Sequence, residues 1–124
     1  MGKFIIKKTN TGYRFDLAAS NGEVIAASQV YKSLRTCKAG IASLQRNCQV
    51  AVEDQTVDPV AAVKCPKFEV YKDKADEFRF RLRASNGQNI TTSGEGYTTK
   101  SACLNGIASI GRNAVDAKIV MAED

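Results

Sequence analysis

Hydrophobic and polar residues alternate with a period of two along several short stretches of this chain. The clearest stretches are 4–8, 13–19, 68–72 and 78–84. Period two places one side of a strand against a core and leaves the other side open, so each stretch predicts a β-strand. Shorter alternating segments at 49–53 and 117–121 predict one further strand at the end of each half of the chain.

Two intervening segments instead carry the three-to-four-residue spacing of amphipathic helices. The apolar stripes consist of Leu34, Cys37, Ile41 and Leu44 in the first segment and Cys103, Ile107 and Ile110 in the second. Ser33 and Thr99 precede these stripes and are predicted to cap the helix N-termini. Asn47 and Asn113 follow them and are predicted to cap the C-termini in a left-handed conformation.

The same order of elements occurs twice because the chain contains an internal duplication. The recurring segments are Arg14–Gly22 with Arg79–Gly87, Gly40–Ser43 with Gly106–Ser109, and Arg46–Asn47 with Arg112–Asn113. One half alone would bury only about 60% of its unfolded surface. We therefore expect one pseudo-two-fold domain of 124 residues. Its parts are repeat one at 2–53, an acidic linker at 54–66 and repeat two at 67–121.

The hairpin turns allow a prediction of strand register. Ser20–Gly22 and its counterpart Ser85–Gly87 contain Asn-Gly, which tolerates the positive φ of a tight turn. A three-residue loop would set Leu17 opposite Ile25, and Leu82 opposite Ile90. Isoleucine occurs at this position in both halves, which favours the three-residue loop over a two-residue one.

The duplicated pattern resembles the YegP-like family of small bacterial domains of unknown function. The pattern is Lys-Phe, then Arg-Phe-x-Leu-x-Ala-Ser-Asn-Gly, then Gly-Ile-Ala-Ser and Arg-Asn, and it occurs at 3–47 and again at 67–113. The resemblance implies an α+β fold of two β3-α-β repeats that form one antiparallel sheet. It also implies that both helices pack on one face and that the repeats exchange their last strands. Single-repeat relatives do this as homodimers, so we expect a monomer that is an internal pseudo-dimer.

Composition removes several classes of chemistry. The chain has no His, which excludes Ser-His-Asp and Cys-His catalysis and every His-containing metal site. The four cysteines are Cys37, Cys48, Cys65 and Cys103, and no two of them have zinc-knuckle spacing. We expect free thiols, with Cys48 and Cys65 the more accessible ones. The sequence therefore predicts no catalytic residue, no metal and no cofactor, and the family resemblance implies none.

The sequence also shows no recognisable targeting signal. The apolar start of the chain is too short for a signal peptide, and no apolar run approaches the ~20 residues that span a bilayer. We therefore expect a cytoplasmic protein with no membrane partner.

The strongest candidate for function is the outer face of the predicted sheet. In the second half, Tyr71 and a row of three arginines, Arg79, Arg81 and Arg83, lie on this face. Arginine pairs with phosphate, and aromatic rings stack on bases, so the row predicts weak binding of nucleic acid or another polyanion, helped by Lys7 and Arg14. An ordinary solvated face of an antiparallel sheet alternates in the same way and remains the alternative.

The distribution of charge favours a second hypothesis. Net charge is +5 overall, from 18 basic and 13 acidic residues, and the more basic half is the first, which lacks the arginine row. Its outer face is predicted to carry an apolar patch of Ile5, Ala18, Val24 and Ala26, which could dock an unidentified protein partner. The two hypotheses depend on whether a helix or the linker covers the outer face near Arg81.

Overall fold

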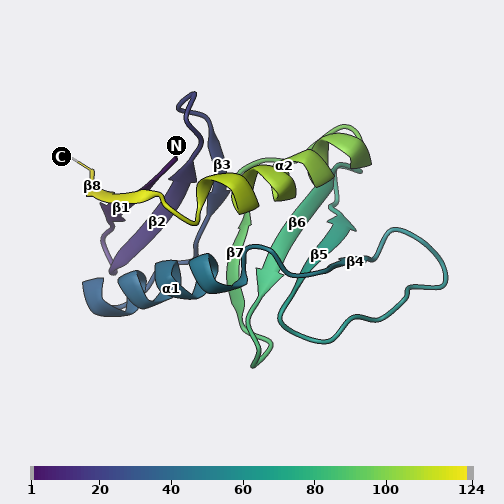
Figure 1. Ribbon diagram of the computed structural model, residues 1–124, viewed down its shortest axis with the longest axis horizontal. Coiled ribbons are helices and arrows are strands. Elements are labelled where there is room, and N and C mark those ends of the chain that lie inside the picture. The colour runs from purple at the N-terminus through teal and green to yellow at the C-terminus, as the bar shows by residue number, and fades with distance from the viewer. Residues whose placement is uncertain (1, 123–124) are drawn as a thin grey trace.

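The computed structural model describes residues 2–122 and contains one eight-stranded sheet and two helices (Figure 1). The first half supplies β1 (Lys3–Lys8), β2 (Tyr13–Ala18), β3 (Val24–Ala27), α1 (Leu34–Asn47) and β4 (Val52–Asp54). The second half supplies β5 (Lys67–Lys72), β6 (Phe78–Arg83), β7 (Asn89–Ser93), α2 (Lys100–Asn113) and β8 (Lys118–Met121). The strand order across the sheet is β4-β5-β6-β7-β3-β2-β1-β8.

The sheet joins the two halves at its centre and at both of its edges. At the centre, β3 pairs antiparallel with β7 through Ala26 with Ser93 and Ala27 with Thr92. At the edges, β4 of the first half pairs with β5 of the second, and β8 of the second half pairs with β1 of the first. The predicted exchange of last strands is confirmed. The inner six strands are antiparallel as predicted, whereas the two exchanged strands pair parallel, so the sheet is mixed.

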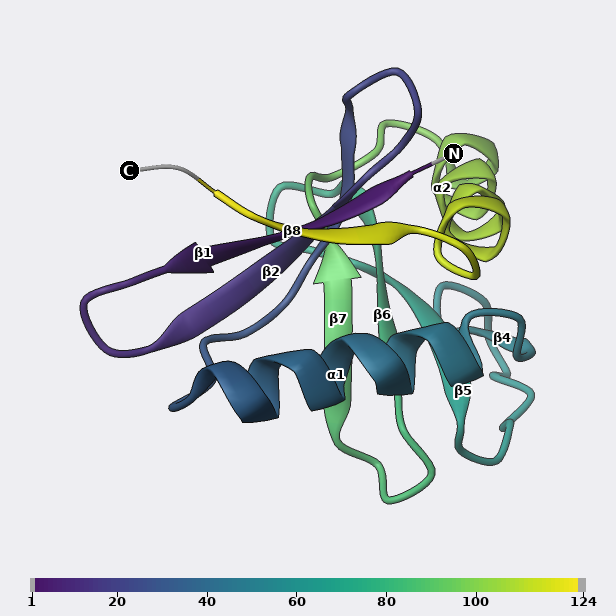
Figure 2. The same ribbon diagram turned by 60° about the vertical axis from the view of Figure 1, so that its left-hand side comes forward.

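One hydrophobic core lies between the sheet and the helices. Strand alternation turns Phe4, Phe15, Phe68 and Phe80 toward the helices, where all four are fully buried. Helix α1 packs on β2 and on β7, and α2 packs on β6 and on β3. Figure 2 shows α1 crossing β7 on this side of the twisted sheet. Because each helix contacts strands of both halves, neither half has a core of its own.

The helix starts follow the sequence prediction and the helix ends do not. The side chains of Ser33 and Thr99 accept hydrogen bonds from the N–H groups of Thr36 and Ala102, each at 3.1 Å. The prediction of left-handed C-caps at Asn47 and Asn113 is wrong. The helices end instead at Cys48 and Ala114, whose backbones are in the right-handed helical region. Each asparagine stays helical and donates its side-chain amide to a carbonyl one turn earlier.

The predicted register is also wrong by one residue, although the loop length is right. The Ala19 N–H donates to the Glu23 carbonyl, which closes a three-residue loop, and Gly22 has a φ of 85°. A bulge then sets Leu17 opposite Ala26, and in the second half Leu82 opposite Thr91. The extra residue of the bulge lets both Ile25 and Ala26 be buried, at 7% and 0% exposure.

This bulge moves two residues off the outer face where the sequence had placed them. Ala26 and Thr91 pair with the core residues Leu17 and Leu82, so both lie on the helix side of the sheet. The Thr91 hydroxyl donates to the carbonyl of Ala27 at 2.7 Å, which satisfies its buried polar group.

Two helical glycines allow a tyrosine to pack against the helix backbone. A Cβ added at Gly106 would lie 2.6 Å from the hydroxyl of Tyr97 and 3.2 Å from the ring of Phe80. Gly40 has the same relation to Tyr31 in the first half. Glycine lowers helix propensity, but a larger residue at either position would displace the tyrosine ring. Tyr31 stacks on Phe15, and Tyr97 stacks on Phe80.

Replacing the packed glycine should therefore destabilise the fold although it improves helix propensity. We expect Gly106→Ala to lower the free energy of unfolding by about 1–3 kcal/mol, because the Tyr97 ring must move. Gly111→Ala in the same helix is the control: its Cβ meets nothing closer than 3.4 Å, so it should stabilise by about 0.5–1 kcal/mol. Urea unfolding of both variants measures the difference, and equal effects would contradict this packing.

Candidate functional site

The face of the sheet away from the helices carries a cluster of charged side chains. Its basic residues are Lys3, Lys7, Arg14 and Lys118 over the first half and Lys67, Arg79, Arg81 and Arg83 over the second. Its acidic residues are Asp16 over the first half, Glu53 and Glu69 over the second, and Asp73 in the adjoining turn. We call this surface the outer face. It carries most of the excess positive charge of the chain, whose net charge is +5.

Over the second half, one buried carboxylate organises the arginine row. Glu69 is only 4% exposed and accepts hydrogen bonds from the Nε atoms of Arg81 and Arg83, at 2.5 and 2.8 Å. Lys67 Nζ lies 3.1 Å from Glu69 and 2.8 Å from Glu53 on β4, so it bridges the two carboxylates. The arginines are thus fixed in position, and part of their charge is neutralised.

Tyr71 and Arg79 complete this cluster. The guanidinium of Arg81 lies 4.4 Å from the centre of the Tyr71 ring, a cation–π contact. Arg79 pairs with Asp73 at 2.5 Å from its Nε. The structure therefore brings the four predicted residues of the second half together. What the sequence prediction missed is that these arginines form ion pairs with Glu69 and Asp73.

The linker touches this cluster without burying it. Gln55 lies 3.4 Å from Arg81 Nη2, and the N–H of Val63 donates to Glu53 at 2.9 Å. The rest of the linker loops out beyond the β4 edge of the sheet (Figure 1). The side chains of Arg79, Arg81 and Arg83 keep exposures of 35%, 26% and 31%. The side chains of the arginine row, Arg81 included, are therefore partly accessible to solvent. The nucleic-acid hypothesis requires this accessibility.

The carboxylates of this cluster have strongly lowered pKa values. Burial alone would raise the pKa of Glu69, but its bonds with Arg81, Arg83 and Lys67 outweigh burial and lower it to about 2. The pKa of Glu53 is also lowered to about 2, chiefly by the hydrogen bond from Lys67 and then by that from Gln55. Both groups are therefore ionised at neutral pH and hold the cations in place.

The first half has the opposite arrangement of charge. Asp16 stands at the position that Arg81 occupies in the second half, and Ile5 stands at that of Glu69. Asp16 is 3% exposed and lies 2.9 Å from Lys7 Nζ and 3.7 Å from Arg14. A buried carboxylate therefore also holds the predicted Lys7 and Arg14. This carboxylate lies on the second strand of its hairpin, whereas Glu69 lies on the first strand of the equivalent hairpin.

The two predicted groups of cations do not form one continuous row. Strands β7 and β3 separate β6 from β2, a gap of about 14 Å at the usual spacing between strands. The apolar patch predicted over the first half also changes. Ala26 faces the core and Ala18 is 1% exposed, which leaves Ile5 and Val24, joined by Val120 of the exchanged β8.

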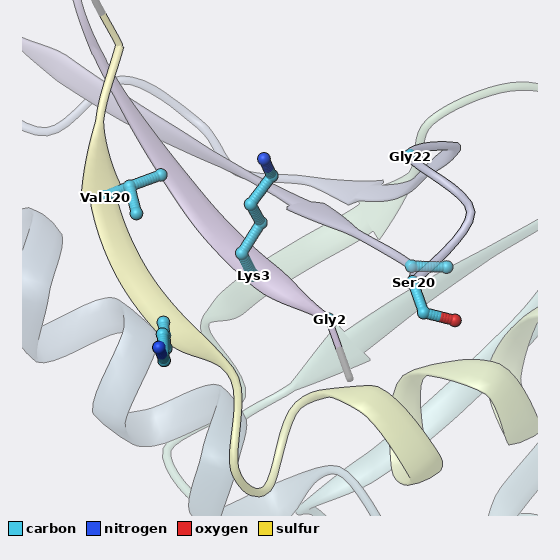
Figure 3. A pocket seen from close by; sticks show the side chains of 7 residues that line it. Gly2, Lys3, Ser20, Gly22 and Val120 are labelled. Atoms are coloured by element: carbon cyan, nitrogen blue, oxygen red, sulfur yellow. The ribbon is translucent and has the colours of Figure 1, made fainter.

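The exchanged strand creates a hollow that sequence reasoning missed. Lys118 pairs with Lys3, and both lie beside the hairpin turn at Ser20 and Gly22, around a hollow of about 350 Å³ (Figure 3). Within residues 2–122, no acidic side chain lies at ion-pair distance from Lys3 or Lys118. Only knowledge that β8 crosses to β1 could have placed these two lysines together.

The cysteines offer no activated nucleophile in the described chain. All four are free, and Cys48 is 3% exposed, so its predicted accessibility is wrong. Burial raises the pKa of Cys103 to about 11 and also raises those of Cys37 and Cys48. Between residues 2 and 122 there is no group of three or more Cys, Asp or Glu side chains that could hold a metal ion, and no helix long and apolar enough to cross a membrane.

Fold and surface together define a tandem β3-α-β protein with exchanged strands and an open, charged sheet face. The chain belongs to the family described as Domain of unknown function (DUF1508), whose model matches residues 9–54 and 73–120. The family thus covers both repeats, as the resemblance implied.

Relatives with the same two-repeat length are similar along almost the whole chain. The UPF0339 protein YegP of Yersinia pestis is 35% identical over 120 residues, which cover 96% of this chain and 94% of that one. A UPF0339 protein of Bordetella pertussis is 39% identical over 116 residues, covering 94% and 91%. A shorter UPF0339 protein of Treponema denticola is 56% identical over 54 residues, 44% of this chain and 91% of its own length.

Two solution structures share the fold. The UPF0339 protein SO3888 of Shewanella oneidensis superposes with a TM-score of 0.78 at 29% identity, covering 97% of this chain and 90% of that one. YegP of E. coli, described as a protein of unknown function, gives a TM-score of 0.78 at 28% identity, covering 99% and 96%. The family is thus uncharacterised, and none of these relatives carries the name of an enzyme.

The lowered pKa of Glu69 predicts how stability depends on pH. Its pKa falls from 4.5 to about 2 on folding, so its contribution is complete above pH 4.5 and is lost as the pH falls toward 2. We expect the thermal midpoint of the natural protein to fall across this window. Glu69→Gln should start lower at pH 7, because Lys67, Arg81 and Arg83 lose their partner, and should fall less on acidification. Parallel pH profiles of the two proteins would contradict this role.

Proposed function

We propose that this protein is a non-catalytic binding module whose outer face binds an anionic polymer, with single-stranded nucleic acid as the first candidate. The observation that carries the proposal is the distribution of charge. Eight basic side chains and four acidic ones belong to the outer face, in a chain whose net charge is +5. Clustered positive charge on one face is the electrostatic signature of polyanion binding.

The arginine row has the geometry of a phosphate-binding surface. In each of Arg79, Arg81 and Arg83 the Nε atom bonds to a carboxylate, which fixes the guanidinium while the side chain stays partly exposed. Arg81 Nη2 also bonds to Gln55 and Arg83 Nη1 to the Gly87 carbonyl. A guanidinium already held in one orientation loses less entropy when it binds phosphate. Tyr71 with Arg81 stacked on it offers a platform on which a base could stack.

The acidic partners limit the strength of this binding. Glu69 and Asp73 neutralise part of the charge of the arginine row, so the uncompensated charge lies over the first half, at Lys3 and Lys118. A polymer is therefore expected to contact both cation groups, across the gap formed by β7 and β3. Several separate phosphate contacts give weak affinity that falls steeply with salt.

Fluorescence anisotropy with a labelled single-stranded RNA of about 12 nucleotides tests the proposal. We expect binding at low salt that weakens by at least roughly tenfold between about 50 and 200 mM salt. Changing Arg79, Arg81 and Arg83 together to Ala should weaken binding by at least roughly tenfold, because each lost phosphate contact removes about one unit of salt slope. The matched control changes Arg35, Lys38 and Arg46 to Ala, which removes the same charge from the exposed side of α1.

A second variant separates binding from folding. Lys3→Gln with Lys118→Gln removes two cations that lack an acidic partner among residues 2–122, so the Glu69 cluster stays intact. The affinity for RNA should again fall, and the slope of log affinity against log salt concentration should decrease by about one unit or more. Absence of binding at low salt, or an equal loss in the α1 control, would refute the proposal.

A further inference from the structure

The two edges of the sheet are built differently although the pseudo-symmetry relates them. At one edge, the linker returns to β4, where the Val63 N–H and Gln55 both bond to Glu53. At the other edge, every residue of β8 is exposed. Ile119, Val120 and Met121 keep 45%, 38% and 51% of their surface in contact with solvent. In Figure 1, no described element lies beyond β8.

The backbone of β8 is oriented to accept another strand. The Ala122 N–H donates to the Ile6 carbonyl at 2.8 Å, and Ile6 is aligned with Met121 in the parallel ladder. Parallel pairing uses alternate residues of a strand, so the N–H and C=O groups of Ile119 and Met121 point away from β1. An unpaired strand edge of this kind is a template for strand addition, and proteins usually blunt it with charges, proline or a covering segment.

The side chains beside this edge indicate the chemistry of an occupant. On the outer side of the sheet, Lys118 is aligned with Lys3 of β1. Lys7 lies on the same side of β1, further along the strand. On the helix side, Ile119 and Met121 present apolar surface. An added strand would turn alternate side chains to these two sides. Acidic residues would meet the lysines on one side, and apolar residues would meet Ile119 and Met121 on the other.

Charge complementarity decides between two occupants. A second copy of this chain, paired through β8, would bring together two molecules that each carry +5 and the same lysines. An acidic segment instead neutralises Lys3 and Lys118, which lack partners within the described residues. The hollow bounded by these lysines, Val120 and the turn at Ser20 offers room for an acidic side chain at one end of the added strand (Figure 3).

We propose that the open edge of β8 binds an extended protein segment with alternating acidic and apolar residues, which adds to the sheet as a ninth strand. This mode of recognition takes affinity from main-chain hydrogen bonds and specificity from the alternation of side chains. The site is separate from the arginine row on β6 and does not depend on nucleic-acid binding, although it shares Lys3 and Lys118 with the proposed polymer surface.

A synthetic peptide of six residues that alternates glutamate with valine is the probe. Added at about 1 mM to the ¹⁵N-labelled protein, it should shift the amide resonances of β8 and slow hydrogen exchange at Ile119 and Met121 by at least roughly tenfold. Val120 should change less, because its N–H already faces β1. A peptide with the three glutamates in one block and the three valines in another has the same charge and composition. It should bind at least roughly tenfold more weakly.

A proline substitution tests the main-chain contact without altering the lysines. Met121→Pro removes an outward N–H and leaves the bonds of β8 to β1 in place, since proline is tolerated where the N–H of an edge strand faces solvent. It should abolish peptide binding, whereas Met121→Ala should keep most of it. Both variants should bind RNA as the natural protein does, so the failure of one proposal is distinguishable from that of the other.

Three results would overturn the proposal. One is equal binding of the alternating and blocked peptides, which would mean charge attraction alone. Another is protection confined to amides outside β8. The third is a concentration-dependent dimer by sedimentation that Met121→Pro converts to monomer while the peptide leaves β8 unprotected, which would make a second copy the occupant.

Discussion

The exchange of β4 and β8 between the two halves is the constraint on which the rest of the structure depends. In each half, the helix that follows the three-stranded meander connects it to the exchanged strand, since α1 lies between β3 and β4 and α2 lies between β7 and β8. Helix α1 therefore starts after β3 and delivers β4 to the far half of the sheet, and α2 does the same for β8. The helices lie across strands of both halves, so the single core and the single sheet are consequences of the same connection.

The duplication preserved the core and allowed the outer face to diverge. Phe4 and Phe15 form an edge-to-face contact in the first half, and their counterparts Phe68 and Phe80 form the same contact in the second. On the outer side, Ile5 corresponds to Glu69 and Asp16 to Arg81, so the buried carboxylate has changed strand. Val120 likewise corresponds to Glu53 on the exchanged strands. One half therefore presents a fixed and compensated arginine row. The other presents Lys3 and Lys118, which have no acidic partner among residues 2–122, beside an apolar edge.

Much of this architecture could be predicted from the sequence, because each half repeats the same period-two and helical patterns. The strands, the N-caps at Ser33 and Thr99 and the helix-facing phenylalanines follow from local patterns alone. The exchange of last strands came from the family resemblance, since pairing between distant strands leaves no local signal. Features that depend on one extra residue or on tertiary contacts could not be read this way. The bulge at Ile25 is one example, and the burial of Cys48 under the core is another.

The sequence predicted which residues make up the arginine row, but it did not predict the ion pairs that they form. Alternation alone placed Arg79, Arg81 and Arg83 on one face with Tyr71. The pairing of Glu69 with Arg81 also follows once the hairpin register is known, because the two residues lie directly opposite each other. The meeting of Lys3 with Lys118 was missed, because the resemblance implied the strand exchange but not the register that sets these two residues side by side. The candidate surface is therefore a product of the topology as much as of the duplicated motif.

We propose that the outer face of the sheet, and not the helical side, is the working surface of this protein. Chemical-shift mapping tests it most directly, by titrating single-stranded RNA into the ¹⁵N-labelled protein at low salt and following backbone amides and arginine Nε–H signals. We expect shifts at the Nε–H groups of Arg79, Arg81 and Arg83 and at the amides of β1, β2 and β6. Shifts concentrated on α1 and α2, with the arginine signals unchanged, would contradict it.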